Sequence, residues 1–317
     1  MSKMNIGVIG TGYLGKFHVE KYARMPHVNL VGVVDSNKDR ASRIAQKYET
    51  KPYTRYQDLF GLVDAVSIVV PTQLHYGVAK DCLINNIDVL IEKPITETIA
   101  QADELIQIAS DNNRLIQVGH LERFNPVVEA IRDLVDRPLF IESHRISVYK
   151  GRGIDVSVVL DLMIHDIDII KNFAKSEVKS IHAAGVPVIC SDVDIANARI
   201  EFTKGCIANV TASRISMKEE RKIRIFQKDA YFSVDFAKKD ITYIQRKGTE
   251  KNAIIPGMDI QKFHFDDGDA LNSEIKSFIT CVQSRDIPEV PGNAGRDALQ
   301  IALDIMEQMN ARIQNFQ

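Results

Sequence analysis

Asp161 and His165 bring a carboxylate and an imidazole together at a spacing of four residues. On a helix this spacing places both side chains on one face, where the carboxylate can orient the imidazole for proton transfer near neutral pH. Asp168 lies nearly one turn further along the same face. The pattern also fits a core histidine beside a carboxylate at a helix N-terminus. We expect no metal here, since a metal site needs further ligands.

Lys93 follows an apolar run and stands between Glu92 and Pro94. A lysine at the end of a strand can hydrogen-bond a substrate hydroxyl or pass on its proton. The bond before Pro94 belongs to the only class that is often cis, and a cis bond would aim Lys93 in an unusual direction. The position of Lys93 by itself fits a surface lysine that precedes a proline as well as it fits a catalytic lysine.

A glycine-rich turn, Gly-Thr-Gly-Tyr-Leu-Gly, occupies residues 10–15 between an apolar run and a helical pattern. In a dinucleotide-binding unit, Gly10 would permit the tight turn, Gly12 would let the backbone approach the pyrophosphate, and Gly15 would let the helix pack on the strand. Asp35 ends the next apolar run, where its carboxylate can accept hydrogen bonds from ribose hydroxyls. Asp35 therefore favours NAD over NADP. Arg40 could soften this preference, but it also fits a solvated helix residue.

The first third of the chain alternates apolar strands with helices, which predicts a doubly wound parallel sheet. We expect strands at 5–9, 29–34, 65–70, 88–91 and 115–118, and helices at 14–24, 38–48, 74–85 and 99–111. Ligands of such sheets bind beyond the carboxyl ends of the strands. The residues expected to bind the cofactor are therefore Gly10, Thr11, Gly12, Tyr13, Leu14, Gly15, Asp35, Pro71, Thr72, His75, Glu92 and Lys93.

After residue 121 the pattern changes to alternating strands joined by turns, which predicts an antiparallel sheet. We expect strands at 140–148, 180–189, 195–202, 206–213, 222–226, 231–236 and 241–245, helices at 126–135, 158–173, 272–283 and 294–310, and a loop at 246–259. The chain is predicted to be an α/β protein with a dinucleotide-binding domain at 1–121 and a substrate-binding and oligomerisation domain at 122–317.

The composition excludes several classes of protein. A formal net charge of −2 over 317 residues gives no electrostatic reason to expect nucleic acid or an anionic membrane as a partner. We see no signal peptide and no apolar run long enough to span a bilayer. Four dispersed cysteines without a CxxC pair predict reduced core residues of a cytoplasmic protein.

The glycine turn, the Glu92-Lys93-Pro94 segment and the Asp161–His165 pair together resemble the Gfo/Idh/MocA oxidoreductases. The resemblance covers essentially the whole chain. It implies an N-terminal Rossmann domain, a C-terminal α/β domain with an open, mostly antiparallel sheet, and a homodimer or homotetramer formed through that sheet. It also implies that Lys93, Asp161 and His165 are catalytic and that NAD is the cofactor. Many members carry glycines just before the aspartate, whereas residues 156–160 of this chain contain none.

Residues 119–126 and 161–168 also resemble a bacterial branch that includes UDP-N-acetylglucosamine 3-dehydrogenases. This resemblance implies oxidation of a secondary hydroxyl of a sugar or nucleotide sugar, with Lys93, Arg123, Asn125 and His165 at the substrate. A diphosphate would need cations. The candidates are Arg123, Arg145, Lys150, Arg152 and Arg214, each of which also fits a surface residue. An inositol or free-sugar dehydrogenase, or a non-catalytic NAD-binding regulator, stays open as an alternative.

Overall fold

The computed structural model of the chain describes residues 3–149, 156–190, 192–246 and 257–314. The chain forms two compact units. The first contains Met1–Leu121 and Asp269–Leu299, and the second contains Glu122–Gly268 and Gln300–Gln317. The division into domains 1–121 and 122–317 stays a prediction, and in the structure the segment Asp269–Leu299 groups with the first unit.

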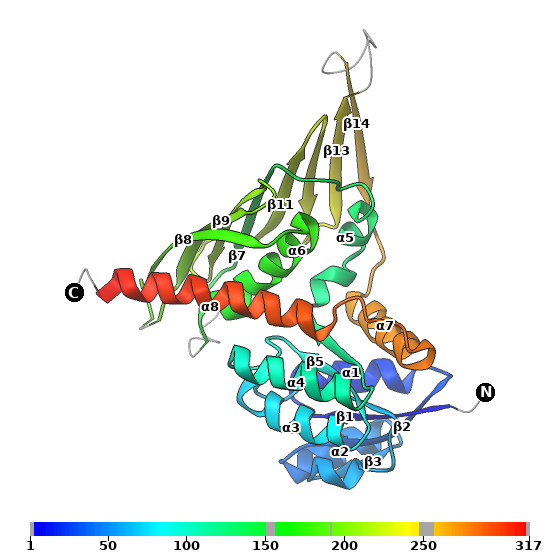
Figure 1. Cartoon of the computed structure of the whole chain (residues 1–317). Coiled ribbons are helices and arrows are strands. Elements are labelled where there is room, and N and C mark those ends of the chain that lie inside the picture. Colours follow the sequence, from blue (N-terminus) through cyan, green and yellow to red (C-terminus); the bar gives the residue numbers. More distant parts are fainter. Residues whose placement is uncertain (1–2, 150–155, 191, 247–256, 315–317) are drawn as a thin grey trace. The chain divides into compact units, whose positions relative to one another are not determined.

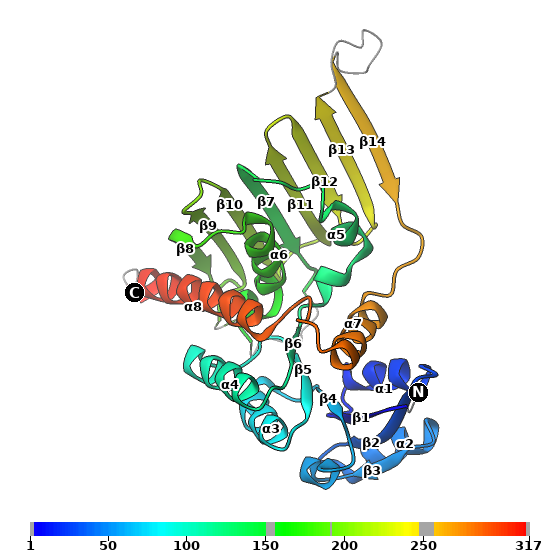
Figure 2. The same ribbon diagram turned by 45° about the vertical axis from the view of Figure 1, so that its right-hand side comes forward.

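A six-stranded parallel sheet forms the centre of the first unit (Figures 1 and 2). Its strands lie in the order β3-β2-β1-β4-β5-β6, and the order reverses between β1 and β4. Both faces of the central strands are covered, which explains their continuous apolar sequences. The strands are β1 Met4–Ile9, β2 Val28–Val34, β3 Lys51–Tyr53, β4 Ala65–Ile68, β5 Asp88–Glu92 and β6 Ile116–Gly119.

The helices that connect these strands agree with the sequence-based expectation. They are α1 Gly15–Ala23, α2 Lys38–Lys47, α3 Thr72–Ile84 and α4 Ile99–Asp111. Local sequence fixes two of their starts: the Asn37 side chain caps α2, and Thr98 and Gln101 form a capping box at α4. A short 3₁₀ turn, η1 Tyr56–Leu59, follows β3.

Helix α7, Ala270–Ser284, joins the first unit because its apolar face completes that unit's core. Ile275, Phe278 and Ile279 are buried in one cluster with residues of β1, β2 and α1. Beyond the helix, Arg285 forms an ion pair with Asp88 of β5 at 2.5 Å. A burial of this kind is worth several kcal/mol, so it accounts for the return of the chain to the first unit.

The second unit is built on an eight-stranded sheet in the order β14-β13-β12-β11-β7-β10-β9-β8 (Figure 2). Every pair of neighbours is antiparallel except β7 and β10, which are parallel. The strands are β7 Phe140–Ile146, β8 Val178–Val186, β9 Ile195–Phe202, β10 Ile207–Ser213, β11 Glu220–Gln227, β12 Ala230–Asp235, β13 Asp240–Arg246 and β14 Met258–His264. The expected loop at 246–259 is wrong at Arg246, which ends β13, and at Met258 and Asp259, which begin β14. Its residues 247–256 lie outside the described ranges.

Helices of the described residues cover one face of this sheet, here called its inner face, and leave the opposite, outer face uncovered by them (Figure 2). They are α5 Pro126–Ile131, α6 Ile164–Ala174 and the later part of α8 Gly292–Gln314. Gln308 of α8 hydrogen-bonds the backbone of Ile181 and Ala183 in β8, which ties this helix to the edge of the sheet. A π-helical turn, η3 Val159–Met163, precedes α6, although the sequence predicted one α-helix over 158–173.

Two further observations concern the whole of the described chain. Among its helices, none has an apolar stretch of the length that a bilayer demands. The four cysteines are free thiols, three of them buried.

Candidate active site

The glycine turn between β1 and α1 is shaped by two of its three glycines. Gly10 has a φ of +93°, and a Cβ added there would lie 2.2 Å from the carbonyl oxygen of Val69. A Cβ on Gly15 would lie 1.9 Å from the carbonyl oxygen of Gly10. A Cβ on Gly12 would meet nothing within 4 Å. The protein's own backbone thus requires Gly10 and Gly15, while Gly12 leaves open space for a ligand to approach.

The N-terminus of α1 is available to an anion. Leu14 is the N-cap residue, its side chain accepts no capping hydrogen bond, and the first turn holds no acidic residue. The N–H groups of this turn and the partial positive charge of the helix end therefore favour a phosphate. Tyr13 is largely exposed beside it, edge-on to Phe17, and the Lys16 ammonium lies 4.8 Å from the centre of each ring.

Asp35 is held at the end of β2 by four hydrogen bonds. Its Oδ2 accepts from the backbone and the hydroxyl of Thr11 at 3.1 and 2.8 Å and from Arg40 at 3.3 Å, and its Oδ1 accepts from the Asn37 N–H at 2.9 Å. Burial raises the pKa of the Asp35 carboxyl, but these donors outweigh it and hold the pKa below its ordinary value. Asp35 is therefore an ionised acceptor with lone pairs left for a ligand.

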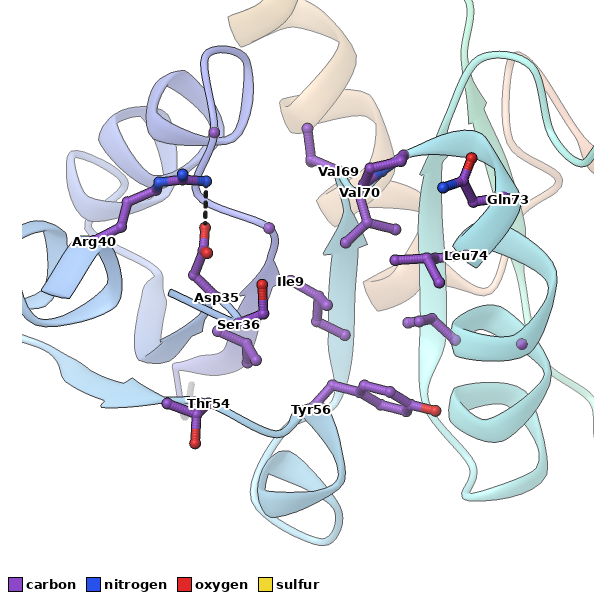
Figure 3. A pocket seen from close by; sticks show the side chains of 16 residues that line it. Ile9, Asp35, Ser36, Arg40, Thr54, Tyr56, Val69, Val70, Gln73 and Leu74 are labelled. Atoms are coloured by element: carbon purple, nitrogen blue, oxygen red, sulfur yellow. Dashed lines mark hydrogen bonds and ion pairs between the residues drawn. The ribbon is translucent and has the colours of Figure 1, made fainter. Parts of the chain in front are cut away.

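A pocket of about 530 Å³ opens beside Asp35 at the point where the strand order reverses (Figure 3). Asp35 and Arg40 lie on one side of it, and Val70, Gln73 and Leu74 lie across from them. A pocket at this position of a doubly wound sheet is where dinucleotides bind. Of the expected cofactor residues, the pocket brings together Gly10, Gly12, Asp35 and Pro71.

The sequence left Arg40 open between a modifier of the cofactor preference and a solvated helix residue, and in the structure it pairs with Asp35 and lines the pocket. Sequence reasoning missed two other residues of this pocket. Thr54 and Tyr56 also line it, and they follow β3. The signal for Thr54 and Tyr56 was their position after a strand, but that strand was not predicted. The Tyr56 hydroxyl donates to Asp81 at 2.7 Å; burial and this hydrogen bond raise the pKa of Tyr56 to about 12.

His75 connects two of the expected site segments rather than pointing into the pocket. Its ring nitrogens lie 2.9 Å from the carbonyl oxygens of Val70 and Pro94, and the side chain is buried. Burial lowers the pKa of His75 against the opposing effect of the two carbonyls. Thr72 begins α3 beside it. His75 therefore fixes the segment after β4 to the segment after β5.

Lys93 lies just beyond β5, at the carboxyl edge of the parallel sheet. It is half-buried, and the Lys93–Pro94 bond is cis. The Lys93 N–H donates to Glu92 Oε2 at 3.3 Å, while Glu92 Oε1 lies 3.2 Å from Nε2 of the buried His18. Glu92 thus faces the interior and holds the start of the Lys93 segment.

Asp161 and His165 lie on the π-helical turn and at the start of α6, respectively. Both side chains are half-buried, whereas Asp166 and Asp168 of the same segment are buried. π-Helical turns are rare and occur often at functional sites. The pair is therefore partly accessible on a locally widened helix, as a proton-transfer group requires.

The structure gives the expected substrate cations other partners. Arg123 makes a two-pronged ion pair with the buried Asp168, at 2.7 and 2.8 Å. Arg145 binds Asp166 in the same way and also donates to Glu122 at 2.8 Å. Burial raises the pKa of the Glu122 carboxyl, but Arg145 outweighs burial and holds this pKa below its ordinary value. The Arg214 guanidinium donates to a backbone carbonyl, that of Val156.

Asn125 also has a local task, since it caps α5 and donates to Glu122. Lys150 and Arg152 lie outside the described residues. Of the five cations considered for a diphosphate, the three that the structure describes are thus engaged within the protein itself.

The pyrophosphate and ribose of NAD fit the open approach at Gly12, the uncapped start of α1 and the ionised Asp35. The first unit therefore has the fold and the site of a dinucleotide-binding oxidoreductase. Residues 4–120 match the family described as an oxidoreductase family with an NAD-binding Rossmann fold, and residues 142–233 match the GFO/IDH/MocA C-terminal domain. The chain belongs to the Gfo/Idh/MocA family of NAD-binding dehydrogenases.

Two relatives, one of them also compared through its solved structure, place the chain within this family. It is 34% identical to the UDP-N-acetylglucosamine 3-dehydrogenase of Acidithiobacillus ferrooxidans over 99% of this chain and 100% of that protein. A solved structure of that enzyme superposes with a TM-score of 0.91 at 33% identity, covering 98% of this chain and 99% of the other. The scyllo-inositol 2-dehydrogenase (NAD(+)) of Bacillus subtilis is 27% identical over 91% of this chain and 89% of its own length.

Proposed function

We propose that this NAD-dependent dehydrogenase oxidises the 3-hydroxyl of UDP-N-acetylglucosamine or of a closely similar UDP-sugar. The observation that carries the proposal is the 34% identity to the Acidithiobacillus enzyme over the full length of both chains. The alignment includes both units, so the likeness extends beyond the shared nucleotide-binding fold.

The chain's own residues supply cofactor binding and proton transfer. NAD, held by Asp35 and the start of α1, would supply the acceptor for the hydride of the carbinol carbon. We assign acceptance of the hydroxyl proton to His165, with Asp161 holding the imidazole in the required tautomer. Lys93 donates a hydrogen bond to the same oxygen, which stabilises the negative charge that develops there. Asp35 accepts hydrogen bonds from the adenosine ribose, and the start of α1 binds the pyrophosphate.

A substrate panel tests the assignment. The purified protein is incubated with NAD and, separately, with UDP-N-acetylglucosamine, UDP-glucose, N-acetylglucosamine, glucose and myo- and scyllo-inositol, while the absorbance of the reduced cofactor is followed. We expect turnover with UDP-N-acetylglucosamine at a kcat/KM far above that of the free sugars. Mass spectrometry of the product should show the loss of two hydrogens. Equal turnover with N-acetylglucosamine would show that the enzyme does not recognise the nucleotide, and would contradict a UDP-sugar as the substrate.

An inositol dehydrogenase is the second candidate, favoured by the similarity to the Bacillus subtilis enzyme along most of both chains. This candidate predicts that an inositol outperforms every UDP-sugar in the same panel. If the protein binds NAD but turns over no alcohol, it is instead an NAD-binding regulator.

We also propose that the sheet of the second unit forms a homodimer or homotetramer. Support comes from an aromatic group on its outer face, where Phe226 lies between Phe140 and Tyr231 with ring centres 5.7 and 4.9 Å apart. Phe226 is 37% exposed, an unusual position for a phenylalanine in contact with two further rings. Light scattering after size-exclusion chromatography should give a dimer or tetramer mass, which Phe226→Arg should lower. A monomer for the unmodified chain contradicts this.

A further inference from the structure

Glu274 of α7 is a fully buried carboxylate that the proposed mechanism does not use. Its relative exposure is 0%. Within the described part of the chain, neither of its carboxylate oxygens has a hydrogen-bond donor. A buried carboxylate without a donor or a counter-charge costs several kcal/mol. Another species beside Glu274 must therefore compensate this buried charge.

The groups that face Glu274 are His18 and Tyr22 of α1 and Glu92 of β5. One ligand atom each from His18, Glu92 and Glu274 lies within 4.8 Å of the other two. Two carboxylates this close in a dry interior cannot both stay ionised without a cation. The compensating species is thus either a proton on one of them or a bound metal ion.

The hydrogen bonds around His18 favour the proton. Tyr22 lies 2.8 Å from Ser67 Oγ, which lies 3.2 Å from His18 Nδ1, and His18 Nε2 lies 3.2 Å from Glu92 Oε1. A neutral His18 satisfies the whole chain when Ser67 donates to Nδ1 and Nε2–H donates to Glu92. A metal ion would have to take the Nε2 lone pair and break that last contact.

Glu92 and Glu274 differ in their other surroundings. Glu92 already accepts from His18 and from the Lys93 N–H. Burial raises the pKa of Glu274 well above its usual range, and the charge of Glu92 acts in the same direction. The proton therefore belongs on Glu274, which leaves the nearby Glu92, within 4.8 Å, as the ionised carboxylate.

We propose that Glu274 is a positioning residue that carries a proton at neutral pH and, together with His18, fixes the Glu92 carboxylate that holds the backbone of Lys93. The role of Lys93 in this inference rests on the proposed function. The protonation of Glu274 does not, and the two can be tested separately.

Infrared spectroscopy tests the protonation without any assay. The difference spectrum between the unmodified protein and Glu274→Gln at pH 7 should contain the C=O band of a protonated carboxylic acid. Absence of that band, or a stoichiometric metal ion found by elemental analysis of the purified protein, would overturn the proposal.

Kinetics test the positioning. Glu274→Gln keeps a neutral donor, so its kcat should stay within about twofold of the unmodified enzyme. Glu274→Ala should lower kcat by about tenfold to a hundredfold with little change in the KM for NAD, because a displaced Lys93 weakens the chemical step rather than cofactor binding. Gln283→Ala, at an exposed position of the same helix, is the matched control.

Equal losses in Glu274→Gln and Glu274→Ala, or no loss in either, would reject the positioning role. Should Lys93→Ala retain full turnover, the proposed function fails while the infrared result on Glu274 still stands.

Discussion

We propose that Asp35 combines a structural and a ligand-binding task in one carboxylate. Thr11 and Asn37 fix its orientation, so its remaining lone pairs point in a defined direction before any ligand arrives. Arg40 adds a cation 3.3 Å away on the pocket side. We therefore propose that the preference for NAD depends on a balance between Asp35, which would repel a 2′-phosphate, and Arg40, which would attract one.

Removing Asp35 should shift that balance. We expect Asp35→Ala to raise the KM for NAD by about tenfold or more, because hydrogen bonds to a charged group are lost. The same variant should accept NADP better than the unmodified enzyme does. In Asp35→Ala/Arg40→Ala the gain with NADP should disappear, since the attracting cation is gone. Steady-state kinetics with both cofactors measure this, and an unchanged NAD/NADP ratio in Asp35→Ala contradicts the role of Asp35.

The proton-transfer groups give a second prediction at this scale. Lys93→Ala and His165→Ala should each lower kcat by about a hundredfold or more, with NAD binding retained. Lys276→Ala and His27→Ala change the same residue types at exposed positions and should leave kcat unaltered. Wild-type turnover in either Lys93→Ala or His165→Ala would refute its assignment.

The buried ion pairs show why individual residues were hard to assign from the sequence. Arg123 and Asp168 are 45 positions apart, and Arg145 and Asp166 are 21 apart. No spacing rule links such partners, so both arginines matched the pattern of free cations for a diphosphate. Asp35, in contrast, could be assigned because it has a fixed place relative to the glycine turn.

At the scale of elements, the glycine turn offers a matched pair of substitutions. Gly15→Ala puts a methyl group against the Gly10 carbonyl and should lower the stability of the protein by several kcal/mol. Gly12→Ala has room in the folded chain and should leave the melting temperature almost unchanged while weakening NAD binding, because the methyl group occupies the approach to the pyrophosphate. Calorimetry and cofactor titration separate the two. A large loss of stability in Gly12→Ala would contradict this account.

Helix α7 is predicted to stabilise the cofactor-binding unit. Phe278 is fully buried in the cluster shared with β1, β2 and α1, so Phe278→Ala should cost about 3–5 kcal/mol. Denaturant unfolding measures the loss, and bound NAD should partly restore stability because it binds the folded unit. A cost below about 1 kcal/mol would show that α7 packs less firmly than its burial indicates.

The regular helices and the buried strands were predictable because their apolar periodicity is strong. Strand β3 was missed, since its three residues include Pro52 and present no apolar run. Strand β14 was missed because it lies at the edge of its sheet and is largely polar. The π-helical turn was missed because its five residues, Val159–Met163, are mostly apolar, so the apolar periodicity of the sequence does not show where the helix widens.

For the molecule as a whole, Glu274 sets a pH dependence of stability with a definite sign. Its pKa is higher in the folded protein than the ordinary value of about 4.3, so folding is coupled to binding a proton. Its contribution to stability is present below pH 4 and is lost as the pH rises through the folded pKa. Glu274→Gln stays neutral, so its stability should exceed that of the unmodified protein increasingly as the pH rises above about 5.

Glu104 provides the opposite case. Hydrogen bonds from Lys80 and Tyr76 lower the pKa of its exposed carboxyl, so its contribution is lost as the pH falls. Urea unfolding should therefore show a difference for Glu274→Gln that grows as the pH rises above about 5, and a difference for Glu104→Gln that is constant there and shrinks only as the pH falls below the ordinary pKa of about 4.3. Parallel trends would contradict the protonated state of Glu274.

The cofactor-binding unit is interrupted in the sequence by most of the second unit, and this has a consequence for biosynthesis. A ribosome delivers residues 1–121 first but releases α7 only after residues 122–268 have emerged. During that interval the apolar surface that Ile275, Phe278 and Ile279 later cover is exposed to water or to chaperones. The cofactor-binding unit, whose first segment is translated before any of the second unit, is thus completed only after residues 269–299 have followed most of the second unit.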